Sequence, residues 1–526
     1  MATVLVADQI AEQGIERLRE RHDAVVRTGL SEDELIEAVA DVSGIIVRSQ
    51  TQVTERIIEA APQLEVIGRA GVGVDNIDLD AATARGVVVV NAPLSNTMSA
   101  IEHAFAMLLA VARNVPQGHA SLREGRWERS RLQGVELAGH TLGVVGLGRI
   151  GSGVAARARA FEMRVIAHDP FVSSERAASI GVELVSLDEL LERSDFVTLH
   201  TALHEGTRGL IGGEQLARMK PGAYLVNTAR GALVDEQALH EAVEGGVIAG
   251  AAIDVFSEEP AIGNVLTATD GVVVTPHLAA STAEAQDRAA VEVVDEVLAV
   301  LAGRPARFAV NAPLVDPETM AIIGPYLDAA EVAASVASQL QGGQLAQLRI
   351  DYLGEIANHE LGPLRAAAIV GVLEPVSHGK VTIVNADQEA RQHGLGIVED
   401  RGAAREPYAN LVVVRVISDS GSTSVAATHT QAGVRIVGID GFEVEIAPSA
   451  TPYVLAVENV DRPGIVGRVG SLLGDWSINI NFMSVASGEE GRALMVLGID
   501  RPLDVSERAA LETLDAIFGV RLINLT

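Results

Sequence analysis

The chain contains no cysteine, which excludes disulfides, a thiol nucleophile and thiolate metal sites. Lysine is nearly absent: Lys220 and Lys380 are the only two, and arginine supplies every other basic side chain. Either a coding bias, which is the simpler explanation, or an adaptation to high salt would account for this pattern. Aromatic residues make up only 3% of the chain, so Ala, Val, Gly and Leu must fill the interior. Such small side chains are typical of α/β proteins, whose helices lie close on buried parallel strands.

Positive charge is also scarce, because 40 basic side chains face 70 acidic ones and give a formal net charge of −30. A surface this negative repels phosphate backbones and anionic membranes, so we expect neither nucleic acid nor a membrane as partner. The longest apolar runs, such as Ala104–Ala112, reach about ten residues, too few to cross a bilayer. The opening residues lack the basic start of a signal peptide, and the histidines lack metal-ligand spacing. We therefore expect a cytoplasmic protein without a metal.

The length of 526 residues predicts three or more domains. Short apolar runs alternate with helical patterns over residues 1–98, which predicts a small doubly wound domain for the substrate. A long buried helix at 99–112 leads into a second such domain over 99–283. A helix at 281–302 and a strand around 307–311 should return, so that residues 284–312 complete the first domain.

The second half of the chain has a different rhythm. Residues 317–450 show one helical stretch and then β-rich segments, which predicts an α+β intervening domain. Residues 452–526 alternate as strand, helix, strand, strand, helix, strand, which predicts a compact ferredoxin-like module. The predicted fold class is therefore α/β, with two doubly wound domains followed by two α+β domains.

A dinucleotide fingerprint lies at the start of the second domain. The segment Gly146-Leu-Gly-Arg-Ile-Gly151 follows a predicted strand and opens a helix, so its backbone N–H groups can face a pyrophosphate. Asp169 ends the next strand, where it can accept the ribose hydroxyls of NAD and repel the 2′-phosphate of NADP. A purely structural turn beside a surface aspartate is the simpler alternative. The expected NAD-binding residues are Gly146, Gly148, Arg149, Ile150, Gly151 and Asp169.

Charged residues follow the later strands of the same domain. Arg230 comes after the strand at 223–227, Asp254 ends the next strand, and His277 ends the last, with Glu259 in the loop between them. The carboxyl ends of parallel strands meet at one edge of a sheet, where ligands bind. Taken singly, each residue has an ordinary interpretation as a surface charge or a packed histidine. Taken together they favour hydride transfer on a 2-hydroxy acid, which requires a cation for the carboxylate and an acid/base for the hydroxyl.

With these motifs in place, residues 3–312 resemble the D-isomer-specific 2-hydroxyacid dehydrogenases. The resemblance implies that Arg230 binds the substrate carboxylate and polarises its carbonyl. It implies that His277 is the acid/base, with Glu259 hydrogen-bonded to the imidazole and favouring its protonated form. It also implies further contacts with NAD, through Asp254 and the Ala229 carbonyl at the nicotinamide amide. Two loop residues complete the expected cofactor set: Thr201 and Thr207.

The first domain should supply the rest of the substrate site. Free N–H groups in the glycine-rich turn at Val72 and Gly73 can hold a carboxylate. Arg48-Ser49 and Arg69 follow strands and can face the cleft; a structural salt bridge is the less favoured alternative for Arg48. The resemblance to those family members that oxidise 3-phospho-D-glycerate implies a phosphate at these positions. It adds two more residues: Asn96, and Arg131 reaching across a dimer interface, where Arg129 is an alternative.

The closing module resembles an ACT domain, and residues 317–450 resemble the intervening domain of the longest family members. ACT domains pair edge to edge and bind small amino acids, so the resemblance implies a tetramer and L-serine as effector. Side chains matching Asn459, Asp461 and Asn479 bind that effector in relatives, although position 459 often carries an aromatic residue or histidine there. The alternative is that both modules serve only oligomerisation.

These expectations converge on one reaction, the oxidation of 3-phospho-D-glycerate by NAD to 3-phosphohydroxypyruvate, as the first step of L-serine biosynthesis. One alternative keeps the chemistry and changes the substrate, giving a glyoxylate or hydroxypyruvate reductase. A second alternative is a non-catalytic NAD-sensing regulator that binds partners through the same fold.

Overall fold

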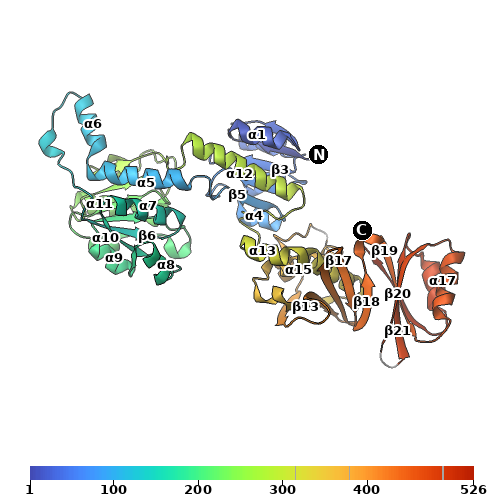
Figure 1. The fold of residues 1–526 in the computed structure, drawn as a ribbon. Coiled ribbons are helices and arrows are strands. Elements are labelled where there is room, and N and C mark those ends of the chain that lie inside the picture. The colour runs from blue at the N-terminus through green and yellow to red at the C-terminus, as the bar shows by residue number, and fades with distance from the viewer. Residues whose placement is uncertain (314, 378–379, 489–490, 526) are drawn as a thin grey trace.

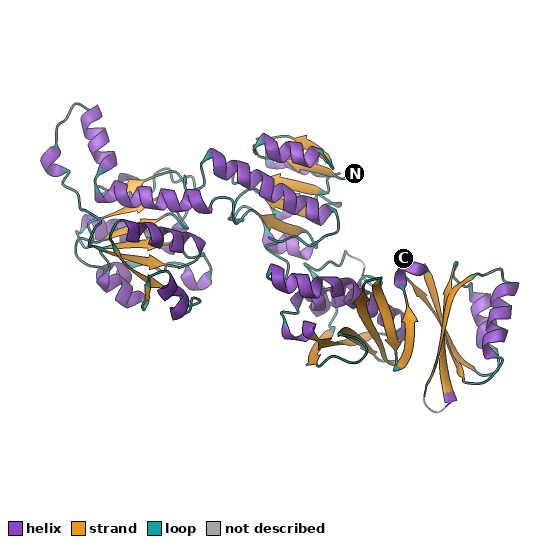
Figure 2. Cartoon of the chain, viewed as in Figure 1, coloured by secondary structure: helices purple, strands orange, loops and turns teal. Residues whose placement is uncertain are grey.

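The computed structural model describes residues 1–313, 315–377, 380–488 and 491–525. Its elements are arranged on four β-sheets that follow one another along the chain (Figure 1). The two sheets of the first half are parallel and carry helices on both faces, as the small side chains predicted. The sheets of the second half contain antiparallel strands (Figure 2). The predicted fold class is thereby confirmed.

The first sheet is parallel, in the order β2-β1-β3-β4-β5. Its strands are β1 (Thr3–Val6), β2 (Asp23–Val26), β3 (Gly44–Val47), β4 (Val66–Arg69) and β5 (Val88–Asn91), and its helices are α1 (Glu12–Arg19), α2 (Glu32–Ala38), α3 (Glu55–Glu59) and α4 (Leu79–Ala84). The returning helix α12 (Ala283–Leu301) packs under this sheet as expected. A Cβ on Gly68 of β4 would lie 2.8 Å from Val297 and 2.9 Å from Val293, so glycine permits this close packing.

The strand expected over residues 307–311 was wrong in extent. Only one bridge forms there, between Ala309 and Val90. The backbone N–H groups of Arg307 and Phe308 instead donate to the buried carboxylate of Glu296, at 2.6 and 3.3 Å. Donors bound to a side chain cannot extend a strand, so the segment is anchored by Glu296 of α12.

The second sheet is parallel, in the order β12-β11-β10-β9-β6-β7-β8. Its strands are β6 (Thr141–Val145), β7 (Arg164–His168), β8 (Glu183–Leu184), β9 (Phe196–Leu199), β10 (Tyr224–Asn227), β11 (Gly250–Ile253) and β12 (Val272–Val274). Its helices are α5 (Thr97–Ala112), α6 (Val115–Arg123), α7 (Arg149–Ala160), α8 (Ser174–Ser179), α9 (Leu187–Arg193), α10 (Gly213–Arg218) and α11 (Glu236–Glu244). The strand order reverses between β6 and β9, which opens a ligand crevice at their carboxyl ends. Helix α6 projects away from this sheet (Figure 1).

The third sheet is mixed, in the order β14-β13-β15-β16-β17-β18. Its strands are β13 (Leu345–Gly354), β14 (Gly396–Gly402), β15 (Asn410–Ser418), β16 (Gly421–Thr430), β17 (Gly433–Ile439) and β18 (Phe442–Ile446). The sequence indicated one helical stretch, but the described residues of this region form four α-helices, of which α14 and α15 pack on the sheet: α13 (Pro317–Ile323), α14 (Leu327–Gln341), α15 (Gly362–Leu373) and α16 (Ala386–Gln392). Residues 362–373 are apolar on all sides, and such a buried helix lacks the amphipathic signal that marks a surface helix.

One stretch is longer and more apolar than expected from the sequence. Residues Glu318–Gln341 have the length and hydropathy of a membrane-spanning helix. Helix α14, which forms most of this stretch, is however the core helix of the third sheet and packs between α15 and strands β15 and β16. Core helices of this kind share the composition of membrane spans, because both are surrounded by apolar groups.

The fourth sheet is antiparallel, in the order β20-β21-β19-β22. Its elements follow the predicted pattern: β19 (Tyr453–Val460), α17 (Ile465–Asp475), β20 (Ile480–Ser487), β21 (Arg492–Ile499), α18 (Val505–Glu512) and β22 (Ile517–Asn524). One face of the sheet packs on α17 and α18, and the opposite face joins the core of the third sheet through Ala456, Leu494 and Val496.

Candidate active site

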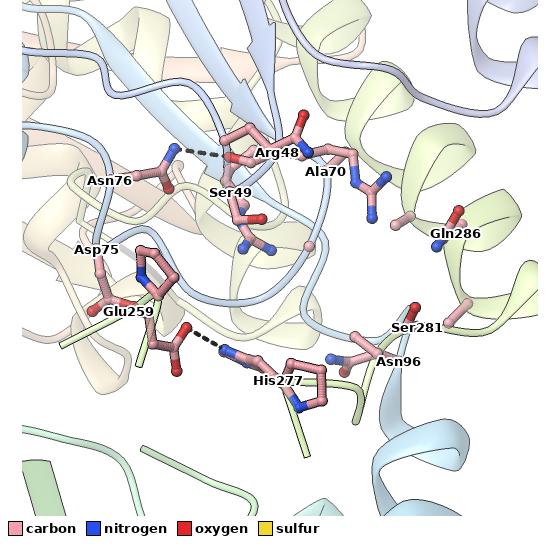
Figure 3. Close-up of a pocket in the computed structure, with 18 of the residues that line it drawn as sticks. Arg48, Ser49, Ala70, Asp75, Asn76, Asn96, Glu259, His277, Ser281 and Gln286 are labelled. Atoms are coloured by element: carbon pink, nitrogen blue, oxygen red, sulfur yellow. Dashed lines mark hydrogen bonds and ion pairs between the residues drawn. The ribbon is translucent and has the colours of Figure 1, made fainter. Parts of the chain in front are cut away.

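A cleft of about 950 Å³ lies where the carboxyl ends of the first and second sheets face each other. It brings together residues that the sequence singled out in both halves: Arg48, Ser49, Arg69, Asn96, Glu259 and His277. Figure 3 shows His277 and Glu259 on one side of this cleft, with Arg48 and Ser49 across from them and Asn96 beside His277. The two sets come from different domains, so the site depends on their apposition.

His277 and Glu259 form the expected pair. The imidazole Nδ1 lies 2.8 Å from Glu259 Oε2, and the other carboxylate oxygen accepts the Phe256 N–H at 3.1 Å. Burial raises the pKa of Glu259, but the hydrogen bonds from His277 and Phe256 outweigh it and hold this pKa below its ordinary value. Glu259 therefore stays ionised at neutral pH and fixes the imidazole, leaving Nε2 to face a substrate.

Arg230 follows β10 and is held by acceptors of this chain. Its Nη1 donates to the Ala229 carbonyl at 2.7 Å, and its Nε lies 3.6 Å from Asp75 Oδ2. A Cβ on Gly73 would lie 2.5 Å from Arg230 Nη2, so glycine at this position makes room for the guanidinium beside the turn. Among the described residues, neither the Val72 nor the Gly73 N–H group donates to a protein acceptor. Arg230 and these amides together can hold a carboxylate.

Arg69 is a cation with incomplete hydrogen bonding. Burial, followed by the nearby Arg230 and Arg48, lowers the pKa of Arg69 to about 10. Its buried Nε has no hydrogen-bond partner in the described part of the chain. A Cβ on Gly71 would lie 1.6 Å from Arg69 Nη1, so this glycine also makes room for a guanidinium. Like charges drawn together in this way favour a bound anion.

Two residues that position Arg48 were missed in the sequence. Asp8 is buried at the end of β1, and its carboxylate accepts the N–H groups of Arg48 and Thr51 at 2.6 and 3.2 Å. Asn76 donates to the Arg48 carbonyl at 2.8 Å (Figure 3) and to the Thr51 carbonyl at 2.6 Å. The signal for Asp8 was its place after a strand, which is the rule that located Arg48.

Asp254 is fully buried, and its contacts differ from those expected at a nicotinamide amide. One oxygen accepts the Thr275 hydroxyl at 2.6 Å and the Leu278 N–H at 2.7 Å, and the other accepts the Ala279 N–H at 3.0 Å. Burial raises the pKa of Asp254, but hydrogen bonds from His103, Thr275 and Leu278 bring it below its ordinary value. Its contact with the cofactor stays a prediction.

The glycine fingerprint has the geometry that a dinucleotide requires. A Cβ on Gly151 would lie 2.0 Å from the Gly146 carbonyl oxygen, and one on Gly146 would lie 2.7 Å from the His200 backbone. Gly146 has a φ of 90°, in the region that favours glycine. Nothing lies within 4 Å of a Cβ built on Gly148, the N-cap residue of α7. The helix N-terminus and its free N–H groups therefore face open space suited to a pyrophosphate.

Asp169 lies beside this loop, where the adenosine ribose is expected. Its carboxylate accepts the Leu147 N–H at 2.8 Å and the Phe171 N–H at 2.9 Å. Thr201 also borders the loop, since its backbone nitrogen is 2.9 Å from a Cβ built on Gly146. Thr207 instead caps a short turn: its hydroxyl donates to the Ala202 carbonyl at 2.7 Å and accepts the His204 N–H at 2.9 Å.

The remaining predicted residues lie outside the cleft. Arg131 is 80% exposed beyond helix α6 and pairs with Glu128 at 3.2 Å. Asn459 is buried in β19 with its Oδ1 lacking a hydrogen-bond partner in the described chain, whereas Asn479 precedes β20 and its N–H donates to Asp500. Asn459 of β19 pairs with Ala493, near the start of β21. Ile480, the residue after Asn479, pairs with Ile499 at the opposite end of β21. One chain therefore does not bring the predicted effector residues together, and that site stays a prediction.

Comparison with known proteins agrees with this architecture. Residues 105–279 match the NAD binding domain of the D-isomer specific 2-hydroxyacid dehydrogenases. Residues 322–440 match the D-3-phosphoglycerate dehydrogenase intervening domain, and residues 453–516 match the ACT domain. Among solved structures, the TT0316 protein from Thermus thermophilus covers 59% of this chain and 99% of its own, with 40% identity and a TM-score of 0.55. D-Lactate dehydrogenase from Aquifex aeolicus, complexed with NAD and lactic acid, covers 57% and 96%, with 31% identity and a TM-score of 0.52.

Fold, cleft and comparison together define an NAD-dependent dehydrogenase of the D-isomer specific 2-hydroxyacid class. The D-3-phosphoglycerate dehydrogenase of Methanocaldococcus jannaschii is 42% identical over 100% of both chains. That of Synechocystis is 44% identical over 96% of this chain and 91% of its own. Within the class, this chain belongs to the D-3-phosphoglycerate dehydrogenase family, which confirms the predicted resemblance and NAD as cofactor.

Proposed function

We propose that this chain oxidises 3-phospho-D-glycerate to 3-phosphohydroxypyruvate with NAD, as the first step of L-serine biosynthesis. The observation that carries the proposal is the position of Arg48 and Arg69 in one cleft, with Arg230 close enough to Arg69 to lower its pKa. A 2-hydroxy monocarboxylate requires one cation, whereas a phosphorylated one carries two anionic groups that require more. The full-length similarity to D-3-phosphoglycerate dehydrogenases supports the same substrate.

In this proposal different side chains bind the carboxylate, bind the phosphate and transfer the proton. Arg230 and the Val72 and Gly73 amides bind the carboxylate, while Arg48, Ser49, Arg69 and Asn96 bind the phosphate. His277 Nε2 takes the proton of the C2 hydroxyl, and the ionised Glu259 stabilises the imidazolium that results. NAD, when bound at Gly146–Gly151 with its ribose at Asp169, supplies the hydride acceptor. Closure of the cleft excludes water and strengthens the arginine contacts.

The proposal extends to assembly and regulation. Exposed apolar residues on and beyond α6, Val115, Leu122 and Trp127, favour an arm that packs on a second copy. Such pairing would place Arg131 near the partner's phosphate site, and pairing of the ACT sheets would make a cytoplasmic tetramer. The buried Asn459 Oδ1, unpartnered within the described chain, is consistent with an effector such as L-serine at that second interface.

Initial rates of NADH oxidation test the substrate directly. The purified chain is supplied with 3-phosphohydroxypyruvate or hydroxypyruvate at matched concentrations and two salt levels. We expect kcat/KM at least about a hundredfold higher for the phosphorylated acid, the scale of one desolvated charge pair. Equal rates, or a preference for hydroxypyruvate or glyoxylate, would favour the reductase. Binding of NADH without turnover of any 2-keto acid would favour the NAD-sensing regulator.

A further inference from the structure

The segment that carries His277 is held in an unusual backbone conformation. His277 has a backbone φ of 53°, a value that residues other than glycine rarely adopt. Its N–H donates to the Asp254 carbonyl at 2.9 Å, while the Asp254 carboxylate accepts the next two N–H groups, those of Leu278 and Ala279. Such a conformation persists only where its surroundings fix it. Asp254 therefore determines how His277 is presented to the cleft.

His103, which was not among the predicted site residues, also contacts the Asp254 carboxylate. His103 lies on α5, and its Nε2 is 3.1 Å from Asp254 Oδ1 and 3.3 Å from the Thr275 hydroxyl. The Thr275 hydroxyl already donates to Asp254, so it can accept from His103 while the imidazole N–H points at both oxygens. The side chain of His103 is 18% exposed, and the Asp254 side chain is fully buried.

Helix α5 is also one of the two connections between the first and second sheets. It begins at Thr97, directly after Asn96 of the cleft, and the Ser99 hydroxyl lies 2.8 Å from that of Thr282. Thr282 caps α12, the segment that returns to the first sheet. His103 thus lies on the element that leads out of the substrate-side domain and touches the carboxylate that orients the catalytic segment.

We propose that His103 is a positioning residue, which donates its Nε2 proton to Asp254 and ties helix α5 to the segment carrying His277. The inference rests on the proposed role of His277 and adds a residue that acts on it through Asp254. Asp254 keeps its bonds from Thr275, Leu278 and Ala279 when His103 is replaced, so the fold survives. Without His103, however, the segment that carries His277 is no longer tied to helix α5, so the imidazole loses its orientation toward the cleft.

The test compares His103→Leu, which lacks the donor, with His103→Gln, whose amide nitrogen can occupy the position of Nε2. His240→Leu is the matched control, because His240 Nδ1 lies 2.8 Å from the Thr269 hydroxyl in the same domain, so this variant also removes an imidazole hydrogen bond but none to Asp254. For each variant kcat and KM are measured with 3-phosphohydroxypyruvate and with hydroxypyruvate, together with the NADH dissociation constant and the melting midpoint.

We expect His103→Leu to lower kcat about tenfold or more with both acids, since proton transfer is sensitive to small displacements, at little change in KM. His103→Gln should recover kcat to within about threefold of wild type, and His240→Leu should leave it unchanged. Full activity in His103→Leu, or equal losses in the Leu and Gln variants, would overturn the proposal. If the wild-type chain turns over only hydroxypyruvate, the substrate assignment fails, while the role of His103 is still decided on that acid.

Discussion

Arginine serves two different purposes in the two halves of this chain. In the third sheet's domain, Arg365 of α15 contacts Asp387 through two nitrogens, at 2.9 and 3.1 Å, and Glu399 through a third, at 3.3 Å. These hydrogen bonds raise the pKa of Arg365 above its ordinary value. In the cleft, Arg69 has its pKa lowered and one buried nitrogen without a partner among the described residues. Arg365 is thus satisfied within the fold, whereas Arg69 is left with hydrogen-bonding capacity that a bound anion can fill.

The largest effect should follow from removing the cation nearest to the reacting carbonyl. We expect Arg230→Gln to lower kcat/KM by about a thousandfold for phosphorylated and unphosphorylated acids alike, since both carry the carboxylate and the carbonyl. Steady-state NADH oxidation measures this. A loss confined to the phosphorylated acid would place Arg230 at the phosphate instead and would contradict its proposed role at the carboxylate.

A second prediction concerns His200, a partly buried histidine at the end of β9 in the same half of the chain. Burial of the imidazole lowers the pKa of His200 to about 4. The folded chain keeps His200 neutral while the unfolded chain protonates it below pH 6.5, so stability is full above that value and falls as pH approaches 4. Between pH 7.5 and 4.5 we expect a loss of about 2 to 3 kcal/mol from this group. Urea unfolding at several pH values measures this loss in wild type and in His200→Gln. If the free energy of unfolding depends on pH identically in the two proteins, His200 is not its source.

Arg69→Gln should separate the two substrates. We expect kcat/KM for 3-phosphohydroxypyruvate to fall by about thirtyfold, because a charge-assisted bond to phosphate is lost, with little change for hydroxypyruvate. Kinetics with both acids provide the readout. Parallel losses would show that Arg69 supports the shape of the cleft rather than the phosphate.

The smallest effect should come from the structural arginine. Arg365→Gln breaks partly exposed ion pairs, so we expect a loss of only about 1 kcal/mol in stability and no change in kcat/KM. Denaturant unfolding and NADH oxidation on the same sample test this. A kinetic effect without a stability effect would contradict the contrast between the two arginines.

The sequence predicted those features that follow from local pattern. Glycine spacing, strand ends and charged residues after strands located Arg230, Glu259, His277 and Arg48, since parallel strands deliver their carboxyl ends to one edge. His103 and Asp8 were missed for different reasons. A histidine within an apolar helix is indistinguishable from a packed core residue until its partner, more than a hundred residues away, is placed beside it. Asp8 obeyed the strand-end rule, but its role depended on contact with a loop forty residues later.

The second half was harder to predict because α15 is apolar on all sides and α16 is short, so neither shows a clear amphipathic period. Sequence pattern indicates that a segment is buried but not against which surface, so α15 and α16 were not foreseen. The ACT module was predictable in order because each strand and helix is short and separated by turn residues. Its effector residues were not placed together, because register within one chain holds them at opposite ends of the sheet.

The most direct test of the central claim is thermal unfolding of wild type and Arg69→Gln, each with and without 3-phosphoglycerate. An unsatisfied cation should destabilise the free protein and become stabilising only when an anion binds. We therefore predict that Arg69→Gln melts a few degrees above wild type without ligand, the shift expected for about 1 kcal/mol, and gains less from the ligand. A variant that melts below wild type without ligand, yet is stabilised equally by it, would contradict the account.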